Sequence, residues 1–556
     1  MIGVVSKQEQ RAAVEEFFQL FKTPWEFAQP GREYGVLLST VDNPPATEAA
    51  LVVFSTAGAI SWDAGLGLQT GARTVAANAQ ADGGSLPLCT AVCALNGGGG
   101  TPLIRKDGEV LATLQRTAAQ TTIRLGYDLF AEVEHLLRVG QPPENALVPT
   151  LDRHIELLRS WMIEAGVSFV EIPPVPAGKD FMVSLTHDID FIGIRRHFCD
   201  HTMFGFLLRS TVGALKDVAR GKIPVSRLLR IWWAVLKLPF VYLGMAKDFW
   251  LPFPWLMEVE KNLPATYYFI PFKGRAGDRL TGKDAPRRAC AYDISDIPEW
   301  TKALQDAGCE IGVHGIDSWH DAAKGRDEIA RVTAVTGNKK PGIRMHWLKW
   351  NDDSYRVLEE AGYSYDSTSG YNEAVGFRNG TAQVFRPLGR SELLEMPMHI
   401  QDGALFYPGR MDLNESRAWE LCERVIASIQ RIGGVATLLW HDRSHGPERF
   451  WGEFYALLVG KLRGMNVWFA SGQQVTDWFR LRRSVTFRVA PGVDDMDSIE
   501  MTSNSAGPLP SLTVRVHRCN GAAAADSTWA GGESTRLSKL FSNPNAAMPA
   551  PKVVCA

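Results

Sequence analysis

The sequence contains few cysteines and no excess of charge of either sign. Its 8 cysteines are spread thinly over 556 residues, which excludes the dense disulfide framework of small secreted domains and favours free thiols in a reducing compartment. Its 59 basic and 61 acidic side chains leave a net charge of −2. The chain as a whole therefore lacks the positive charge that binding to nucleic acid requires, although this balance still permits a local basic patch.

Long apolar runs are missing as well. No uncharged apolar segment approaches the roughly 20 residues that a membrane-spanning helix needs, and the first residues lack the basic-then-apolar order of a signal peptide. We therefore expect a cytoplasmic protein that is at most peripheral at the inner face of the membrane. With 45% hydrophobic and 22% charged residues, the composition is that of a folded chain and excludes a wholly disordered one.

The length indicates several structural units, since a single hydrophobic core stops growing near ~250–300 residues. Residues 1–175 predict an accessory α/β domain, although the stretch 56–100 is rich in Gly, Ala and Ser and shows no periodicity. A proline-rich segment ends this domain, and a long α/β region follows at 181–483. Residues 484–556 predict short β segments and, from Asn520, a disordered tail.

The region 181–483 alternates apolar strand patterns with helical patterns. This alternation favours a parallel sheet or a barrel, in which functional residues gather at the carboxyl ends of the strands. The predicted strands are 181–185, 265–269, 310–313, 394–396, 435–439 and 467–469.

Two carboxylates, Asp188 and Asp190, closely follow the first of these strands in the segment Thr-His-Asp-Ile-Asp. Two acids this close together disfavour each other's ionisation, and a divalent cation bound to one of them removes that penalty. The pair therefore predicts a metal ligand beside a free carboxylate base. The alternative is that Asp190 caps a turn and Asp188 is solvated.

Histidines follow the predicted strand 310–313. His314 precedes a glycine, and Asp317 and His320 lie in the loop after it. Imidazole nitrogens and carboxylate oxygens are common zinc ligands. His314 with His320 or Asp317 therefore predicts a metal site with an open position. The alternative is a hydrogen-bonded structural histidine.

Two further polar residues lie in segments of the same region. Arg344 lies in Gly-Ile-Arg-Met-His-Trp (342–347), and His441 ends Leu-Leu-Trp-His after the strand 435–439. An arginine can orient a carboxylate base through a charge-assisted hydrogen bond, and a histidine across the site can be a general acid. Either Asp402 or Asp442 would raise the pKa of His441, and the sequence does not choose between them.

In this order, the motifs resemble those of the NodB-homology polysaccharide deacetylases, carbohydrate esterase family 4, over residues 181–480. The resemblance implies a distorted (β/α) barrel, with Asp188 as catalytic base and Asp190 as metal ligand. It also implies Arg344 as the arginine that tunes the base and His441 as the general acid. The predicted fold is α/β: this barrel, an N-terminal α/β accessory domain and a small β and disordered C-terminal tail.

The second motif of this family supplies two histidine ligands, of which His314 is the first. The family spaces these histidines four residues apart, whereas His320 lies six residues after His314. Asp317 is therefore a rival to His320 as the third ligand. The resemblance implies a divalent metal ion, with zinc as the expected metal and cobalt, nickel or iron as alternatives.

The resemblance implies a metal-dependent hydrolase that removes an acetyl group from an N-acetylated sugar or polysaccharide, acting on a C–N bond other than a peptide bond. Two alternatives stay open. One is a catalytically inactive member of the fold that binds glycans or acts as a scaffold, and the other is a C–N hydrolase of small cyclic amides.

The aromatic residues expected either to stack on sugar faces or to pack at the rim are Trp347, Trp350, Tyr371 and Trp440.

A basic and aromatic segment at 195–247 interrupts the alternating pattern directly after the first motif. It carries 10 Lys and Arg against 2 Asp, a local balance of +8. Such a helix-prone segment predicts peripheral contact with an anionic membrane. The alternative is a helical hairpin that covers the barrel with its basic residues in water. His197 and His201 are expected to be surface or packing residues.

Overall fold

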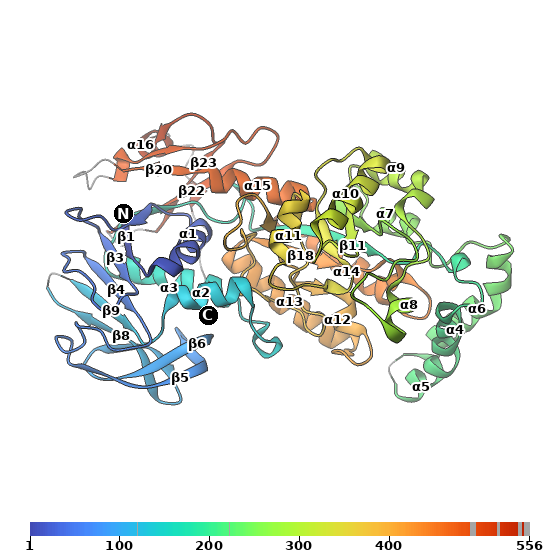
Figure 1. The fold of residues 1–556 in the computed structure, drawn as a ribbon, viewed down its shortest axis with the longest axis horizontal. Coiled ribbons are helices and arrows are strands. Elements are labelled where there is room, and N and C mark those ends of the chain that lie inside the picture. Colours follow the sequence, from blue (N-terminus) through green and yellow to red (C-terminus); the bar gives the residue numbers. More distant parts are fainter. Residues whose placement is uncertain (119, 222, 490–495, 520–522, 543–547, 550–556) are drawn as a thin grey trace.

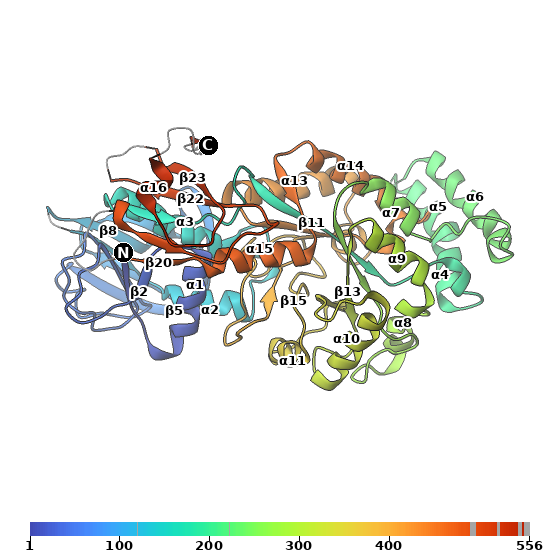
Figure 2. The ribbon, with the colours of Figure 1, turned by 90° about the horizontal axis from the view of Figure 1, so that it is seen from above.

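In the part of the chain that the structure describes, four β-sheets and the helices around them make up the fold (Figure 1). The computed structural model describes residues 1–118, 120–221, 223–489, 496–519, 523–542 and 548–549. The molecule is elongated, with the N-terminal sheet at one end, a long parallel sheet near the middle and a helical arm at the other end (Figure 2).

The N-terminal sheet has nine strands in the order β2–β1–β3–β4–β9–β8–β7–β5–β6. The pairs from β2 to β9 are parallel, and those from β9 to β6 are antiparallel. Strands β3 and β4 are apolar and buried along their whole length, which is typical of parallel strands covered on both faces. The elements are β1 (Ile2–Val5), β2 (Trp25–Phe27), β3 (Val36–Ser39), β4 (Leu51–Ser55), β5 (Leu68–Ala81), β6 (Gly84–Gly97), β7 (Thr101–Lys106), β8 (Glu109–Arg116), β9 (Thr121–Leu125), α1 (Arg11–Leu20), α2 (Leu129–Arg138) and α3 (Thr150–Glu164).

The central sheet consists of parallel strands in the order β16–β15–β14–β13–β12–β11–β18–β17, and β19 pairs with the start of β11. It curls into a half-barrel whose edge strands, β16 and β17, do not pair with each other. The predicted α/β fold with a distorted barrel is thus confirmed. The strands are β11 (Phe181–Ile189), β12 (Ala265–Phe269), β13 (Glu310–Gly315), β14 (Ile343–Met345), β15 (Tyr365–Asp366), β16 (Leu394–Glu395), β17 (Ile400–Gln401), β18 (Val435–Leu439) and β19 (Val467–Phe469).

Helices connect most of these strands, as parallel pairing requires. Their ends follow local sequence signals. Before α10, for example, the Asp321 side chain accepts hydrogen bonds from two backbone N–H groups, and after it Gly337 takes a left-handed conformation (φ 76°). The helices are α7 (Phe253–Val259), α8 (Ala285–Arg288), α9 (Pro298–Asp306), α10 (Ala322–Thr336), α11 (Ser354–Ala361), α12 (Asp402–Phe406), α13 (Glu415–Ile432), α14 (Trp451–Arg463) and α15 (Gly472–Ser484).

Residues 195–221 and 223–247 form a helical arm that projects from the half-barrel (Figure 1). One side of the arm consists of α4 (His201–Leu208), the π-helical turn η4 (Arg209–Gly213) and α5 (Ala214–Ala219), and the other is α6 (Val225–Tyr242). The two sides share small apolar clusters of buried side chains. Within the described ranges, no helix has both the length and the apolar composition needed to cross a bilayer.

The residues after α15 contribute to two small sheets, with the orders β20–β21–β24 and β10–β22–β23–β25. The structure differs here from the predicted disorder: residues 525–541 form two strands and a helix, because Trp529 and Leu537 are buried in a common apolar cluster. Residues 520–522, 543–547 and 550–556 of the predicted tail lie outside the described residues. The elements are β10 (Phe169–Glu171), β20 (Thr486–Arg488), β21 (Glu500–Thr502), β22 (Leu512–His517), β23 (Ala525–Trp529), β24 (Thr535–Arg536), β25 (Met548–Pro549) and α16 (Leu537–Phe541).

A buried carboxylate, Glu16 on α1, joins the N-terminal region to the half-barrel. Its side chain is 2% exposed. It accepts hydrogen bonds from both terminal nitrogens of Arg483 on α15, at 2.7 and 2.8 Å, and from the backbone N–H of Arg386 at 2.8 Å. Because a bidentate arginine–carboxylate pair is strong and geometrically specific, this contact fixes α1 against α15.

Replacing Glu16 with alanine is expected to lower the free energy of unfolding by ~3–5 kcal/mol, because Arg483 is left as an unpaired and largely buried charge. The matched control is Glu15→Ala, since Glu15 is exposed on the same helix; its effect should stay within about 0.5 kcal/mol. Urea unfolding followed by tryptophan fluorescence measures both variants. Equal effects of the two substitutions would contradict the role given to Glu16.

Candidate active site and metal centre

Polar residues from four strands meet at one edge of the half-barrel. Asp188 and Asp190 lie at the end of β11, His314 lies in the last residues of β13, His346 directly follows β14, and His441 follows β18. These strands are all parallel, so their carboxyl ends share one edge. The alternation of strands and helices in the sequence predicts functional residues at this same edge.

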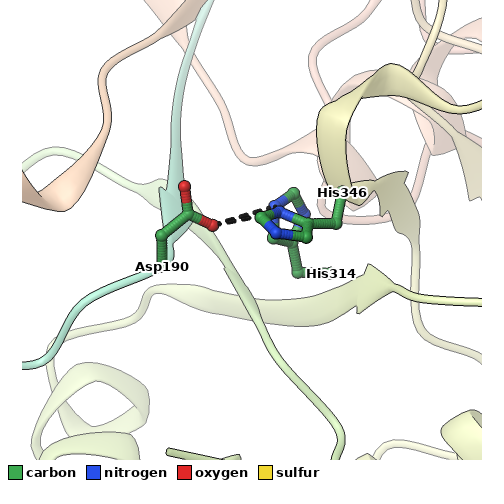
Figure 3. Close-up of side chains that lie close together, drawn as sticks. All are labelled: Asp190, His314 and His346. Atoms are coloured by element: carbon green, nitrogen blue, oxygen red, sulfur yellow. Dashed lines mark hydrogen bonds and ion pairs between the residues drawn. The ribbon is translucent and has the colours of Figure 1, made fainter. Parts of the chain in front are cut away.

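One group of histidine and acidic side chains in the described part of the chain is compact enough to share a metal ion: Asp190, His314 and His346 (Figure 3). Oδ1 of Asp190 lies 3.3 Å from Nε2 of His314 and 3.2 Å from Nδ1 of His346. The two nitrogens are 2.9 Å apart. Ligands ~2.0–2.1 Å from a tetrahedral zinc ion lie about 3.3 Å from one another, so these atoms have the spacing of a ligand set.

The hydrogen bonds of the two histidines direct lone pairs to the centre of this group. Nδ1 of His314 lies 3.0 Å from the carbonyl oxygen of Arg344, and Nε2 of His346 lies 3.1 Å from that of Arg288. Since a carbonyl oxygen only accepts, these outer nitrogens carry the hydrogens and the inner nitrogens are free as ligands. Burial lowers the pKa of His346 in spite of the opposing charge of Asp190, which favours the neutral imidazole that binds metal.

The carboxylate of the group completes the fit to a cation. Oδ1 of Asp190 is buried and accepts no hydrogen bond from any described residue. A carboxylate oxygen and two imidazole lone pairs that converge on one point need a positive charge between them. The donor set therefore fits a divalent metal ion.

The structure does not bring His320 and Asp317 to this group. They pair with each other, with Nε2 of His320 3.0 Å from Oδ1 of Asp317. The same oxygen accepts a hydrogen bond from the backbone N–H of Asp278 at 3.0 Å. His346 lies beside Asp190 and His314, at the position that the sequence predicted for His320 or Asp317.

His346 had a signal in the sequence. In an extended chain, residues two apart point to the same side, and His346 lies two residues after Arg344, which was expected in the site. Strands β13 and β14 pair His314 with Arg344, so the two histidines come from neighbouring strands. The sequence motif takes its histidine ligands from one strand and the loop after it, so it does not include His346, which follows the neighbouring strand.

Asp188 lies beside the metal-ligand group and is held by Arg344. Nη1 of Arg344 donates to Oδ1 of Asp188 at 3.1 Å and to Oγ1 of Thr186 at 2.7 Å. Its Nε and Nη2 donate to the carbonyl and hydroxyl oxygens of Ser367, both at 2.9 Å. Oδ2 of Asp188 lies 3.8 Å from Nε2 of His314. One oxygen of Asp188 is thus tied by the guanidinium, while the other faces the ligand group.

His441 is paired with Asp402 on the other side of β11. Nδ1 of His441 lies 2.6 Å from Oδ1 of Asp402, and the backbone N–H of His441 donates to Oδ2 at 2.9 Å. Burial disfavours the charged imidazole, but the charge of Asp402 outweighs this effect and raises the pKa of His441 to about 9. The side chain is 25% exposed, so a protonated imidazole is accessible at neutral pH.

Asp442, the other candidate partner of His441, points elsewhere. Its Oδ2 accepts a hydrogen bond from the backbone N–H of Phe191 at 2.6 Å, and its Oδ1 has no hydrogen-bond partner among the described residues. Burial and the charge of Asp190 raise the pKa of Asp442, which favours its neutral form. The direct contact therefore assigns Asp402 to His441.

Two of the four aromatic residues considered for sugar stacking are unavailable to a sugar. Trp440 is fully buried in the core of the half-barrel, and Tyr371 is 4% exposed in a cluster with Ala146. Both are packing residues, as the alternative expectation held. Trp347 is 39% exposed, and its position directly after His346 makes it available at the edge of the site.

No protein-family model matches the sequence, and no curated protein matches it. Solved structures do match. A Mycobacterium smegmatis protein assigned as a polysaccharide deacetylase is 21% identical, over 55% of this chain and 94% of that chain, with a TM-score of 0.34. The carbohydrate deacetylase Agd3 is 8% identical, over 96% of this chain and 97% of that chain, with a TM-score of 0.37. A CE4-family pseudoenzyme from Bacillus anthracis is 11% identical, over 52% of this chain and 64% of that chain, with a TM-score of 0.23.

Proposed function

We propose that this chain is a metal-dependent hydrolase that removes the acetyl group from an N-acetylated sugar or polysaccharide. The observation that carries the proposal is the grouping, at one strand edge, of a metal-ligand set, an arginine-held carboxylate and a histidine paired with a buried carboxylate. These are the three functions that hydrolysis of an amide needs: an electrophile for the carbonyl group, a base for water and an acid for the leaving amine.

Asp190, His314 and His346 would hold the divalent ion. Zinc suits two imidazole nitrogens and one carboxylate oxygen, and cobalt, nickel and iron accept similar ligands. We therefore place His346, rather than His320 or Asp317, as the third ligand. When bound, the ion supplies a Lewis acid that polarises a carbonyl group and lowers the pKa of water.

Asp188 is placed to take the proton of the attacking water at Oδ2. Its other oxygen is held by Arg344, whose own position is fixed by three further hydrogen bonds to Thr186 and Ser367. The carboxylate therefore keeps one orientation, with Oδ2 toward the metal-ligand group. Arg344 acts as a positioning residue for this base.

His441 is placed to donate a proton from Nε2 to the departing amine. Asp402 accepts the hydrogen bond of Nδ1, which fixes the orientation of the ring and leaves Nε2 as the donor. A pKa of about 9 keeps the imidazole protonated at neutral pH. Base and acid thus come from the neighbouring strands β11 and β18.

The irregular spacing of His314 and His320 in the second motif favours the alternative of a catalytically inactive glycan-binding protein. With His346 contributed by the neighbouring strand, the ligand set has three members in spite of that spacing. This favours an enzyme. The remaining alternative, a hydrolase of cyclic amides, predicts ring opening without release of acetate.

Release of acetate from N-acetylated chito-oligosaccharides by the zinc- or cobalt-loaded protein tests this function. We expect kcat/KM to fall on the alkaline side near pH 9, because deprotonation of His441 removes the general acid. Asp402→Asn removes the charge that raises this pKa, and burial then lowers it. The alkaline limb should therefore move down by about two pH units.

Asp442→Asn is the matched control, since it replaces the other nearby carboxyl group without touching the ring of His441. Its alkaline limb should stay near that of the wild-type protein. If the wild-type protein releases no acetate with either metal, the proposed function is wrong. If the limb is unmoved in Asp402→Asn, His441 is not the general acid.

A further inference from the structure

The exposed apolar surface of this protein is concentrated on the helical arm. Of the 19 large hydrophobic side chains that are exposed in the described part of the chain, 13 lie between Phe198 and Met245. Single exposed apolar residues are common on soluble proteins, whereas a contiguous group of this kind marks an interaction surface.

Helix α6 is apolar on two faces. Residues such as Ile231, Leu238 and Val241 are buried against the rest of the arm. A second set of apolar side chains recurs every three to four residues along the exposed side of α6, where Trp233 is 59% and Leu236 66% exposed. The members of this outer stripe are Leu229, Trp232, Trp233, Leu236, Phe240 and Leu243.

The other side of the arm carries a stripe of the same kind. Phe204, Leu208, Val212 and Leu215 follow one another at helical spacing through α4, η4 and α5, and all four are about half exposed or more. Because the side chains of both stripes are exposed, the two stripes do not pack against each other. We call the two stripes together the outer face of the arm.

The same arm carries positive charge. Helix α6 contains Arg227, Arg230 and Lys237 but no Asp or Glu. Arg227 and Arg230 pair with Glu453 on α14 at the base of the arm. Four other exposed cations form no ion pair with any described residue: Lys216, Arg220, Lys237 and Lys247. A partner that covers the apolar stripes therefore also has to neutralise these cations.

The arm is anchored beside the candidate active site. It begins a few residues after Asp190, and Asp248 at its other end accepts hydrogen bonds from the backbone N–H groups of Ile194 and Arg195, both at 3.1 Å. Arg443, close to His441 in the chain, stacks over Trp250 at the base of the arm. The base of the arm is thus anchored close to the edge that carries Asp188, Asp190 and the histidines.

We propose that the outer face of the arm docks onto an anionic lipid surface. The apolar stripes, with Trp232 and Trp233, lie among the headgroups and upper acyl chains, and the unpaired cations contact the lipid phosphates. A second copy of the chain fits less well, because a symmetric contact of α6 with α6 would bring the same cations together. This docking does not depend on the proposed deacetylase activity.

Cosedimentation of the full chain with lipid vesicles tests the proposal. Vesicles of phosphatidylcholine with about a third phosphatidylglycerol should bind the protein at low salt, and pure phosphatidylcholine vesicles should bind it at least tenfold more weakly. Trp232→Ser with Trp233→Ser should weaken binding at least about tenfold. Leu457→Ser is the matched control, since Leu457 is 65% exposed on α14, outside the arm, and it should leave binding unchanged.

Charge reversal separates the electrostatic contribution. Lys216→Glu with Arg220→Glu should lower the affinity for the anionic vesicles at least about 25-fold, since each cation near such a surface contributes about fivefold, and should not lower the affinity for neutral vesicles. No binding of the wild-type protein at low salt, or binding that the tryptophan variant retains, would overturn the proposal. So would sedimentation velocity that shows a stable dimer dissociated by the tryptophan substitutions.

Discussion

Replacing His346 with alanine is expected to remove the bound metal ion and to lower acetate release by about 10³-fold or more, the value of a Lewis acid worth several kcal/mol. Nδ1 of His346 lies 3.2 Å from Asp190 and 2.9 Å from the inner nitrogen of His314. Alanine leaves only two of the three ligands. Metal content measured by mass spectrometry of the purified protein, together with acetate release, gives the result.

His320→Ala is the control that tells the two candidate ligand sets apart. The imidazole of His320 is engaged by Asp317 and lies outside the group around Asp190, so this variant should keep its metal and its activity. Circular dichroism of both variants checks that each is folded. If His320→Ala loses its metal while His346→Ala retains it, the third ligand is His320, as the sequence motif predicted.

The strands of the half-barrel were predictable where they are buried on both sides. The apolar runs at 265–269 and 435–439 coincide with β12 and β18, because a strand covered on both faces needs hydrophobic residues without interruption. Strands β15 and β17 contain only two residues each. A pattern of that length carries no period, and the sequence predicted no strand at either place.

The hairpin of β5 and β6 was not predictable for a different reason. Each strand has 14 residues, yet the segment shows no regular alternation of apolar and polar residues. Most of β5 is exposed or half-buried, and two irregularities in its pairing with β6 shift the register. Side chains that face solvent on both sides of a strand impose no period-two pattern, and each bulge would interrupt one.

The sequence predicted those residues of the candidate site that directly follow one apolar strand, but it did not predict the contacts between residues of different strands. Asp188, Asp190 and His314 each follow a recognisable apolar run, and the structure places them at one edge. The pairing of His441 with Asp402 joins residues 39 positions apart, and the contact between His346 and His314 joins neighbouring strands. Both contacts depend on strand order, which the motif spacing does not contain.

Asp188→Asn is expected to lower kcat for acetate release by about 10²–10⁴-fold, the usual contribution of a general base. The amide keeps the shape of the side chain and an oxygen that can accept the hydrogen bond of Arg344, but it cannot take a proton. Metal content should stay at the wild-type level, because Oδ2 of Asp188 lies 3.8 Å from the inner nitrogen of His314, outside the compact group formed by the three ligands.

The two variants therefore separate binding of the ion from transfer of the proton: His346→Ala should lose metal and activity, and Asp188→Asn should lose activity alone. A base acts in the transition state, so KM of Asp188→Asn should change little while kcat falls. A raised KM with an unchanged kcat would mean instead that Asp188 contributes uniform substrate binding. Loss of metal from Asp188→Asn would make Asp188 a fourth ligand, and the base would then have to be sought elsewhere at this edge.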